Sequence, residues 1–161
     1  MKFHNVRIVY FSGTGCTRLV AETFRNQLLE TGHTTTIVEL RHDMTHDESD
    51  YDLLVLCFPV YACNAPQIVI TYVKGSQVVH HIPVALISVS AGGEMTPNLA
   101  CRTSIKKELT RKGFAIHYEK MLVMPSNWVI ATKPCLAALL LRILPKKIRP
   151  VRLEATKTYN Q

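Results

Sequence analysis

The stretch SGTGCT, residues 12–17, contains three hydroxyl side chains and two glycines, and it lies between an apolar run and a helical pattern. Gly13 and Gly15 allow the backbone to turn tightly and to approach a ligand closely. Successive backbone N–H groups and the positive end of the following helix favour an anion, and Ser12, Thr14 and Thr17 add hydroxyl donors. The stretch has no lysine and matches neither GxxxxGK[ST] nor GxGxxG. We therefore predict a terminal-phosphate site without a formal charge, rather than a turn that only caps the helix.

Two further stretches that follow apolar runs have an unusual composition. One is PVYACNAP, residues 59–66, and the other is SVSAGG, residues 88–93. In an open parallel sheet, ligands bind beyond the carboxyl ends of the strands, so we expect these stretches to converge with SGTGCT. Tyr61 comes just after a proline at a strand end, where its ring is suited to stacking on a planar ligand. The alternative for Tyr61 is packing on the helix that follows.

Ser90 also raises a rival interpretation, a hydrolase, because ISVSAGG, residues 87–93, approaches the nucleophile-elbow pattern. Position 88 is serine where that pattern has glycine, and the following helical pattern begins too late for an elbow. The acidic residues between Ser90 and His117 that would complete a triad are Glu94 and Glu108. We do not favour this interpretation.

The five cysteines, at positions 16, 57, 63, 101 and 135, include no CxxC pair, and their number is odd. This pattern argues against a disulfide framework, a zinc site or an iron–sulfur cluster within the chain, and it suits cytosolic thiols. The N-terminus lacks the apolar core and the cleavage site of a signal peptide. The longest apolar stretch is far short of the roughly 20 residues that span a membrane. We therefore expect a cytoplasmic protein.

Strand-like and helix-like patterns alternate along the 161 residues, a length that suits one domain. The alternation predicts a parallel sheet covered by helices on both faces. We expect this domain to span residues 1–150, with residues 151–161 as a tail or a truncated linker. The expected strands are 6–11, 35–40, 53–58, 83–89 and 114–123, and the expected helices are 17–31, 65–73, 96–112 and 133–148.

The formal net charge of +7 is compatible with an acidic partner, an anionic membrane or nucleic acid. The stretch LLLRILPKKIRPVR joins an apolar helical pattern to Lys146, Lys147, Arg149 and Arg152, a combination that suits a membrane surface or a partner. We favour instead the last helix of the domain, packed on the sheet and ending in solvated cations. We predict no nucleic-acid partner and do not favour membrane contact.

The three stretches together resemble the flavodoxin family over about residues 5–130. SGTGCT resembles its phosphate loop, YDLLVLCFPVYACNAP the segment that places a proline and an aromatic at the flavin ring, and SVSAGG the loop at the flavin edge. The resemblance is strongest to the flavodoxin domain of anaerobe flavodoxin–ferredoxin fusion proteins, which also have an element like MPSNW. It implies a flavodoxin-like three-layer α/β/α fold, with a five-stranded parallel sheet of order 2-1-3-4-5, and non-covalent binding of FMN.

The resemblance assigns FMN-binding roles to residues in each stretch. The phosphate would be bound by Ser12, Gly13, Thr14, Gly15, Cys16 and Thr17. One side of the isoalloxazine ring would be lined by Pro59, Val60, Tyr61 and Ala62. Its polar edge would meet Ser90, Ala91, Gly92 and Gly93, and Asn127 and Trp128 would reach the ring or the ribityl chain.

The sequence also departs from the family pattern. Cys16 stands where the family usually has asparagine, so the bracing bonds of an amide side chain are lost. The loop at 59–66 has no glycine, although flavodoxins commonly use one there to flip a peptide toward the reduced flavin. Ala62, Cys63 or Asn64 would have to serve, and Asn64 tolerates unusual backbone angles best. The chain is basic where flavodoxins are typically acidic, and it has no CxxCxxCxxxCP run.

These features predict one- or two-electron transfer, in which the flavin supplies the chemistry and no side chain acts as acid, base or nucleophile. The predicted partner is a redox protein of the ferredoxin type with an iron–sulfur centre. Two alternatives stay open. One is an NAD(P)H-dependent FMN or quinone reductase on the same fold, which needs room for a nicotinamide over the flavin. The other is a flavin-free module with the same fold, whose basic face serves a partner.

Overall fold

The computed structural model of the protein describes residues 3–42, 50–92 and 96–124. The strands are β1 (Asn5–Tyr10), β2 (Thr34–Glu39), β3 (Leu53–Pro59), β4 (Pro83–Ser90) and β5 (Ala115–Val123). The helices are α1 (Cys16–Glu30), α2 (Gln67–Gly75) and α3 (Thr96–Arg111). These elements belong to one unit, Met1–Val123. The expected helix at 133–148, the domain boundary at residue 150 and the tail at 151–161 lie outside the described residues.

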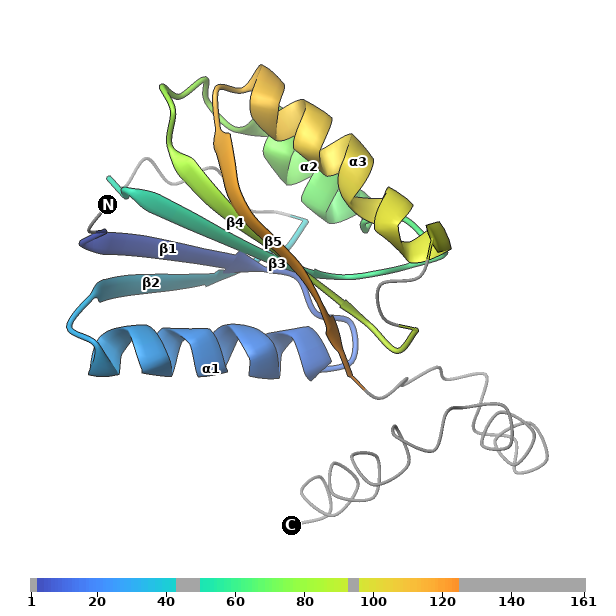
Figure 1. The fold of residues 1–161 in the computed structure, drawn as a ribbon, viewed down its shortest axis with the longest axis horizontal. Coiled ribbons are helices and arrows are strands. Elements are labelled where there is room, and N and C mark those ends of the chain that lie inside the picture. The colour runs from blue at the N-terminus through green and yellow to red at the C-terminus, as the bar shows by residue number, and fades with distance from the viewer. Residues whose placement is uncertain (1–2, 43–49, 93–95, 125–161) are drawn as a thin grey trace, which may run out of the picture. The chain divides into compact units, whose positions relative to one another are not determined.

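The five strands form one parallel sheet in the order β2-β1-β3-β4-β5, which confirms the predicted topology. Helix α1 covers one face of this sheet, and α2 and α3 cover the other (Figure 1). The sheet is therefore the middle layer of the three-layer α/β/α arrangement that the sequence predicted. The strand order reverses direction between β1 and β3, which makes the carboxyl ends of these two strands the expected place for a ligand.

The central strands are mostly apolar because helices cover both faces of the sheet. In β3 the five residues from Leu54 to Phe58 are all buried, and β1 and β4 are similarly enclosed. On the face covered by α2 and α3, Leu56 and Phe58 pack in one cluster with Val69 of α2 and Ile105 of α3. This packing fixes the positions of β3 and β4, whose last residues lead into two of the three stretches singled out above.

The element boundaries differ from the predicted ones by one or two residues. The largest difference is at α2, which was predicted over 65–73 but runs over Gln67–Gly75. Pro66 is its N-cap, with φ −57° and ψ 143°, rather than a residue of its first turn. Ala65 and Pro66 are both buried, so they bring the chain from the loop onto the sheet before the helix begins.

No helix within the described residues is both long enough and apolar enough to cross a membrane.

Candidate functional site

Three loops meet at the carboxyl edge of the sheet because they follow the adjacent strands β1, β3 and β4. Backbone hydrogen bonds fasten the strand ends together just before the loops depart. The Phe11 N–H donates to the Cys57 carbonyl at 3.1 Å, and the Val60 N–H donates to the Val89 carbonyl at 2.9 Å. The predicted convergence of the three stretches is therefore present in the fold.

The first loop ends at Gly15, whose backbone conformation favours glycine over other residues. Gly15 is the N-cap of α1 and has φ +92°, a left-handed conformation that side chains disfavour. The Ser12 Oγ accepts a hydrogen bond from the Gly15 N–H at 3.0 Å and so holds the turn closed. Helix α1 has no side-chain cap and no acidic residue in its first turn. Its first N–H groups, the exposed Thr14 and the helix dipole therefore present donors to an anion.

Cys16 and Thr17 begin α1 in different environments. Cys16 is half-buried, and burial raises the pKa of its thiol, while a hydrogen bond with the Thr14 side chain lowers it. The thiol is therefore protonated near neutral pH and is an unreactive neighbour of the turn. Thr17 has only 2% of its surface exposed, so its side chain anchors the helix start to the interior.

Tyr61 joins the second loop to the first. Its ring meets the Phe11 ring edge-on, with centroids 6.3 Å apart and planes at 88°. Its hydroxyl lies against Gly13, and a Cβ at that glycine would overlap it. The glycine at position 13 therefore makes room for the tyrosine. Tyr61 packs against the first loop but remains 44% exposed, so part of its ring is accessible to a ligand.

The second loop contains a tight turn whose geometry the sequence did not indicate. The Tyr61 N–H donates to the Asn64 carbonyl and the Asn64 N–H donates to the Tyr61 carbonyl, both at 2.9 Å. The two residues between them have positive φ, +47° for Ala62 and +62° for Cys63. This is the pattern of a type I′ turn, which normally has glycine or asparagine at these positions. Of the three residues that could take unusual backbone angles in this loop, Ala62 and Cys63 have positive φ, whereas Asn64 is the last residue of the turn.

The third loop follows β4. The Ser90 Oγ accepts a hydrogen bond from the Gly92 N–H at 3.2 Å, and Ser90 and Ala91 are half-buried. The remaining predicted site residues, Gly93, Asn127 and Trp128, lie outside the described residues.

The strand register excludes the hydrolase interpretation, because it keeps Ser90 and His117 far apart. Ser90 pairs with Val123, whereas His117 lies six residues earlier on β5, about 20 Å from the serine.

The described parts of these loops, residues 12–17, 59–66 and 90–92, contain no lysine, arginine, aspartate or glutamate. Their polar groups are hydroxyls, thiols, one amide side chain and the backbone. An anion bound there would have only N–H and O–H donors and the α1 dipole to hold it. Within the described ranges, no group of three or more potential metal ligands is present.

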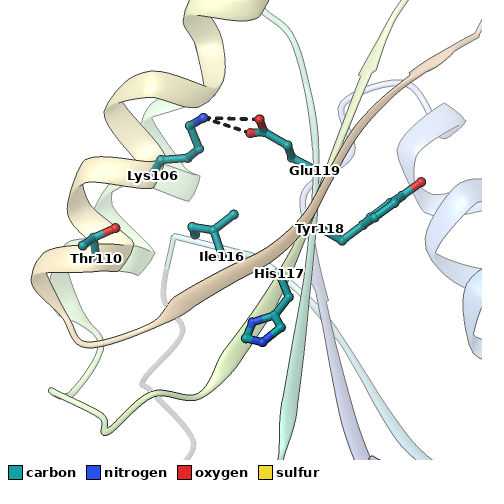
Figure 2. Close-up of a pocket in the computed structure, with 6 residues that line it drawn as sticks. All are labelled: Lys106, Thr110, Ile116, His117, Tyr118 and Glu119. Atoms are coloured by element: carbon teal, nitrogen blue, oxygen red, sulfur yellow. Dashed lines mark hydrogen bonds and ion pairs between the residues drawn. The ribbon is translucent and has the colours of Figure 1, made fainter. Parts of the chain in front are cut away.

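A separate groove of about 360 Å³ lies between α3 and β5 (Figure 2). An ion pair between Lys106 and Glu119 spans this groove, with 3.0 Å between the Lys106 Nζ and the Glu119 Oε2. No residue of the three loops lines this groove, so it is distinct from the candidate site. Its lining residues are Lys106, Thr110, Ile116, His117, Tyr118 and Glu119.

No model of a known protein family matches the sequence, and no curated protein matches it. Solved structures do match. A short-chain flavodoxin associated with a bacterial microcompartment has a TM-score of 0.61 at 17% identity, covering 88% of this chain and 99% of that one. Flavodoxin 1 from Bacillus cereus has a TM-score of 0.60 at 13% identity, covering 83% and 93%. A Fusobacterium nucleatum flavodoxin variant bound to FMN has a TM-score of 0.58 at 14% identity, covering 86% and 94%. Together with the strand order, these likenesses show that the chain has the flavodoxin-like fold.

Proposed function

We propose that the three loops bind FMN without a covalent bond and that the protein transfers electrons. The observation that carries this proposal is the start of α1. Helix α1 has no side-chain cap at Gly15, so the positive end of its dipole follows the turn directly, and the exposed Thr14 stands beside it. The half-exposed ring of Tyr61 lies against the same turn. An anion-binding turn next to an aromatic ring suits a flavin phosphate joined to a planar ring system. The F. nucleatum neighbour carries FMN, which supports the choice of ligand.

Each loop would contribute a different part of the binding. Residues Ser12 to Thr17 would hold the phosphate through backbone N–H groups and the exposed Thr14 hydroxyl, with Ser12 keeping the turn closed and the buried Thr17 side chain fixing the start of the helix. Pro59 to Ala62 would line one side of the ring. The backbone of Ser90 to Gly93 would meet its polar edge, and Asn127 and Trp128 would complete the site. The bound FMN would supply one- or two-electron chemistry, and the protein groups would bind and orient it and exclude water.

The charge and the cysteines of the chain indicate the kind of partner and compartment. We expect electrons to pass to or from an iron–sulfur protein of the ferredoxin type, in the cytoplasm. The free thiols of Cys16, Cys57, Cys63 and Cys101 support a reducing compartment. The basic charge of the chain favours a partner with an acidic surface.

The decisive experiment is a titration of the purified protein with FMN and, separately, with riboflavin, which lacks the phosphate. Thr14→Val should weaken FMN binding about ten-fold, because a hydrogen bond to a charged group is lost, and should leave riboflavin binding almost unchanged. Thr23→Val is the matched control, since this exposed threonine lies on α1 and donates its hydroxyl to the Leu19 carbonyl. Equal losses for FMN and riboflavin would refute the phosphate assignment.

The same preparation separates the alternatives. A protein that FMN does not saturate would exclude flavin binding and leave the flavin-free module. Steady oxidation of NAD(P)H by the FMN-loaded protein, without an added reductase, would identify a reductase instead of an electron carrier.

A further inference from the structure

Hydrogen bonds join the end of α3 to the segment that connects α2 to β4. The Lys112 Nζ donates to the Ser76 carbonyl. The Val79 N–H donates to the Lys112 carbonyl, and the His81 N–H donates to the Gly113 carbonyl, both at 2.8 Å. Gly113 has φ +85°, and a Cβ there would overlap the Val79 carbonyl oxygen. The connecting segment is therefore tied closely to the end of α3, beside the starts of β4 and β5 (Figure 1).

The surface of these segments concentrates positive charge. Residues 74–81 and 107–113 contain four lysine or arginine side chains and one carboxylate, Glu108. The Arg111 guanidinium, hydrogen-bonded to Glu108 at 2.8 Å, lowers the pKa of that carboxyl, and Lys74 and Lys107 act in the same direction. Three cations therefore surround one carboxylate. At the neighbouring strand, the Asp52 carboxylate is engaged by the N–H groups of His4 and Asn5.

The segment that connects α2 to β4 also carries an exposed apolar side chain. Val78 is 69% exposed, the highest value among the exposed large hydrophobic residues of the described chain. Favourable interaction with the helix dipoles accounts for Lys74 and Arg111, which lie in the last turns of α2 and α3. It does not account for the exposed valine in the connecting segment. We call the surface formed by Lys74, Val78, Lys107, Arg111 and Lys112 the basic end.

The basic end lies at the opposite edge of the sheet from the three loops. It adjoins the starts of β4 and β5, whereas the loops follow the ends of β1, β3 and β4. The eight residues of β4 separate the two edges by about 25 Å. A partner bound at the basic end therefore leaves the three loops uncovered.

We propose that the basic end binds an anionic phospholipid surface. Lysine and arginine near such a surface are attracted by its negative potential, and a small apolar group inserts among the headgroups. Residues 74–81 and 107–113 contain no phenylalanine, tyrosine or tryptophan on which the bases of a single-stranded nucleic acid would stack. A single valine is also far less apolar area than the core of a stable protein interface.

The test is sedimentation of the full chain with vesicles of phosphatidylcholine, with and without phosphatidylserine. The double variant Lys74→Gln/Lys107→Gln should bind the mixed vesicles about 30-fold more weakly, because each cation near an anionic surface contributes about a factor of five. The matched control is Arg25→Gln/Arg41→Gln, which removes the same charge from exposed positions on α1 and after β2. The control should retain nearly all of the binding. Val78→Ser should weaken binding without changing the net charge.

Several results would overturn the proposal. One is a wild-type chain that does not sediment with phosphatidylserine vesicles. Another is equal losses in the two double variants, which would indicate an effect of total charge. Binding to a duplex oligonucleotide but not to vesicles would assign the surface to nucleic acid. The test does not involve FMN, so its outcome is independent of the proposed function.

Discussion

The first and second loops of the candidate site use opposite means to reach unusual backbone angles. In the first loop, Gly15 occupies the position with φ +92°, where glycine costs nothing sterically. In the second loop, Ala62 and Cys63 occupy two successive positions with positive φ, and no glycine is present between residues 59 and 66. The first geometry follows from residue type, and the second is imposed on residues that disfavour it.

The difference indicates how each loop is held. The first loop needs only its glycine and the Ser12 hydrogen bond to keep its shape. The second is fixed by the Tyr61–Asn64 hydrogen bonds and by β3, whose buried residues anchor its start. Non-glycine residues in strained conformations persist only where the surrounding structure over-determines them. The second loop should therefore depend on its supporting strand, and the first on its own sequence.

The largest expected effect comes from the strand that supports the second loop. Burial raises the pKa of the Cys57 thiol in β3 from 9.0 to about 12. The folded state then holds the proton over a range in which the unfolded thiol ionises. The free energy of unfolding should fall by about 4 kcal/mol as the pH rises from about 9 to about 12. Urea unfolding followed by circular dichroism across this range measures the fall.

Cys57→Ala tests the origin of that alkaline loss. It should flatten the pH dependence, because the titrating group is gone, leaving the smaller contributions of other groups with raised pKa, such as Tyr51. Cys16→Ala, in the half-exposed first loop, should change the slope much less. If the Cys57 variant keeps the full alkaline slope, the buried thiol is not the cause.

The next effect tests whether glycine defines the first loop. Gly15→Ala should lower the free energy of unfolding by about 1 to 2 kcal/mol, because alanine at φ +92° is strained. Gly32→Ala is the matched control, since Gly32 has φ +83° and open space around an added Cβ. Both variants should lose similar stability, but only Gly15→Ala should weaken FMN binding, by about ten-fold. Equal FMN affinities in the two variants would separate the Gly15 turn from ligand binding.

A smaller effect tests the contact between the two loops. Gly13→Ala should cost about 1 kcal/mol, because the new Cβ displaces the Tyr61 hydroxyl and disturbs the ring contact with Phe11. In a Tyr61→Phe background the hydroxyl is absent, and the same substitution should be nearly neutral. A double-mutant cycle on chemical unfolding measures this coupling. The same cost in both backgrounds would mean that Gly13 is needed for its backbone rather than for Tyr61.

The sequence was sufficient to predict the sheet and the convergence of the loops. Continuous apolar runs identified β1, β3 and β4, since strands buried on both faces have no polar alternation to obscure them. Gly15 could be predicted as a turn residue because glycine is the usual residue at positive φ. The role of Gly13 was only partly visible, because the residue that requires its small size is Tyr61, 48 positions away in the chain.

The turn at Tyr61–Asn64 could not be predicted, for a physical reason. Local preference pointed to Asn64 as the residue with unusual angles, but hydrogen bonding between Tyr61 and Asn64 assigns positive φ to the two residues between them. That pairing depends on where β3 ends, and α2 begins only after the buried Ala65 and Pro66. Tertiary constraints of this kind override single-residue preferences.

The smallest expected effect reverses the usual result of introducing glycine. Ala62→Gly should raise the free energy of unfolding by about 0.5 kcal/mol, because relief of the strain at φ +47° exceeds the entropy that glycine adds to the unfolded chain. Ala100→Gly, at an exposed position of α3, should instead lower it by about 1 kcal/mol. Opposite signs for the same substitution, measured by urea unfolding, would confirm that the second loop is strained. A loss at both positions would mean that the surroundings of Ala62 depend on its methyl group, and the contrast with the first loop would then be one of packing rather than of backbone conformation.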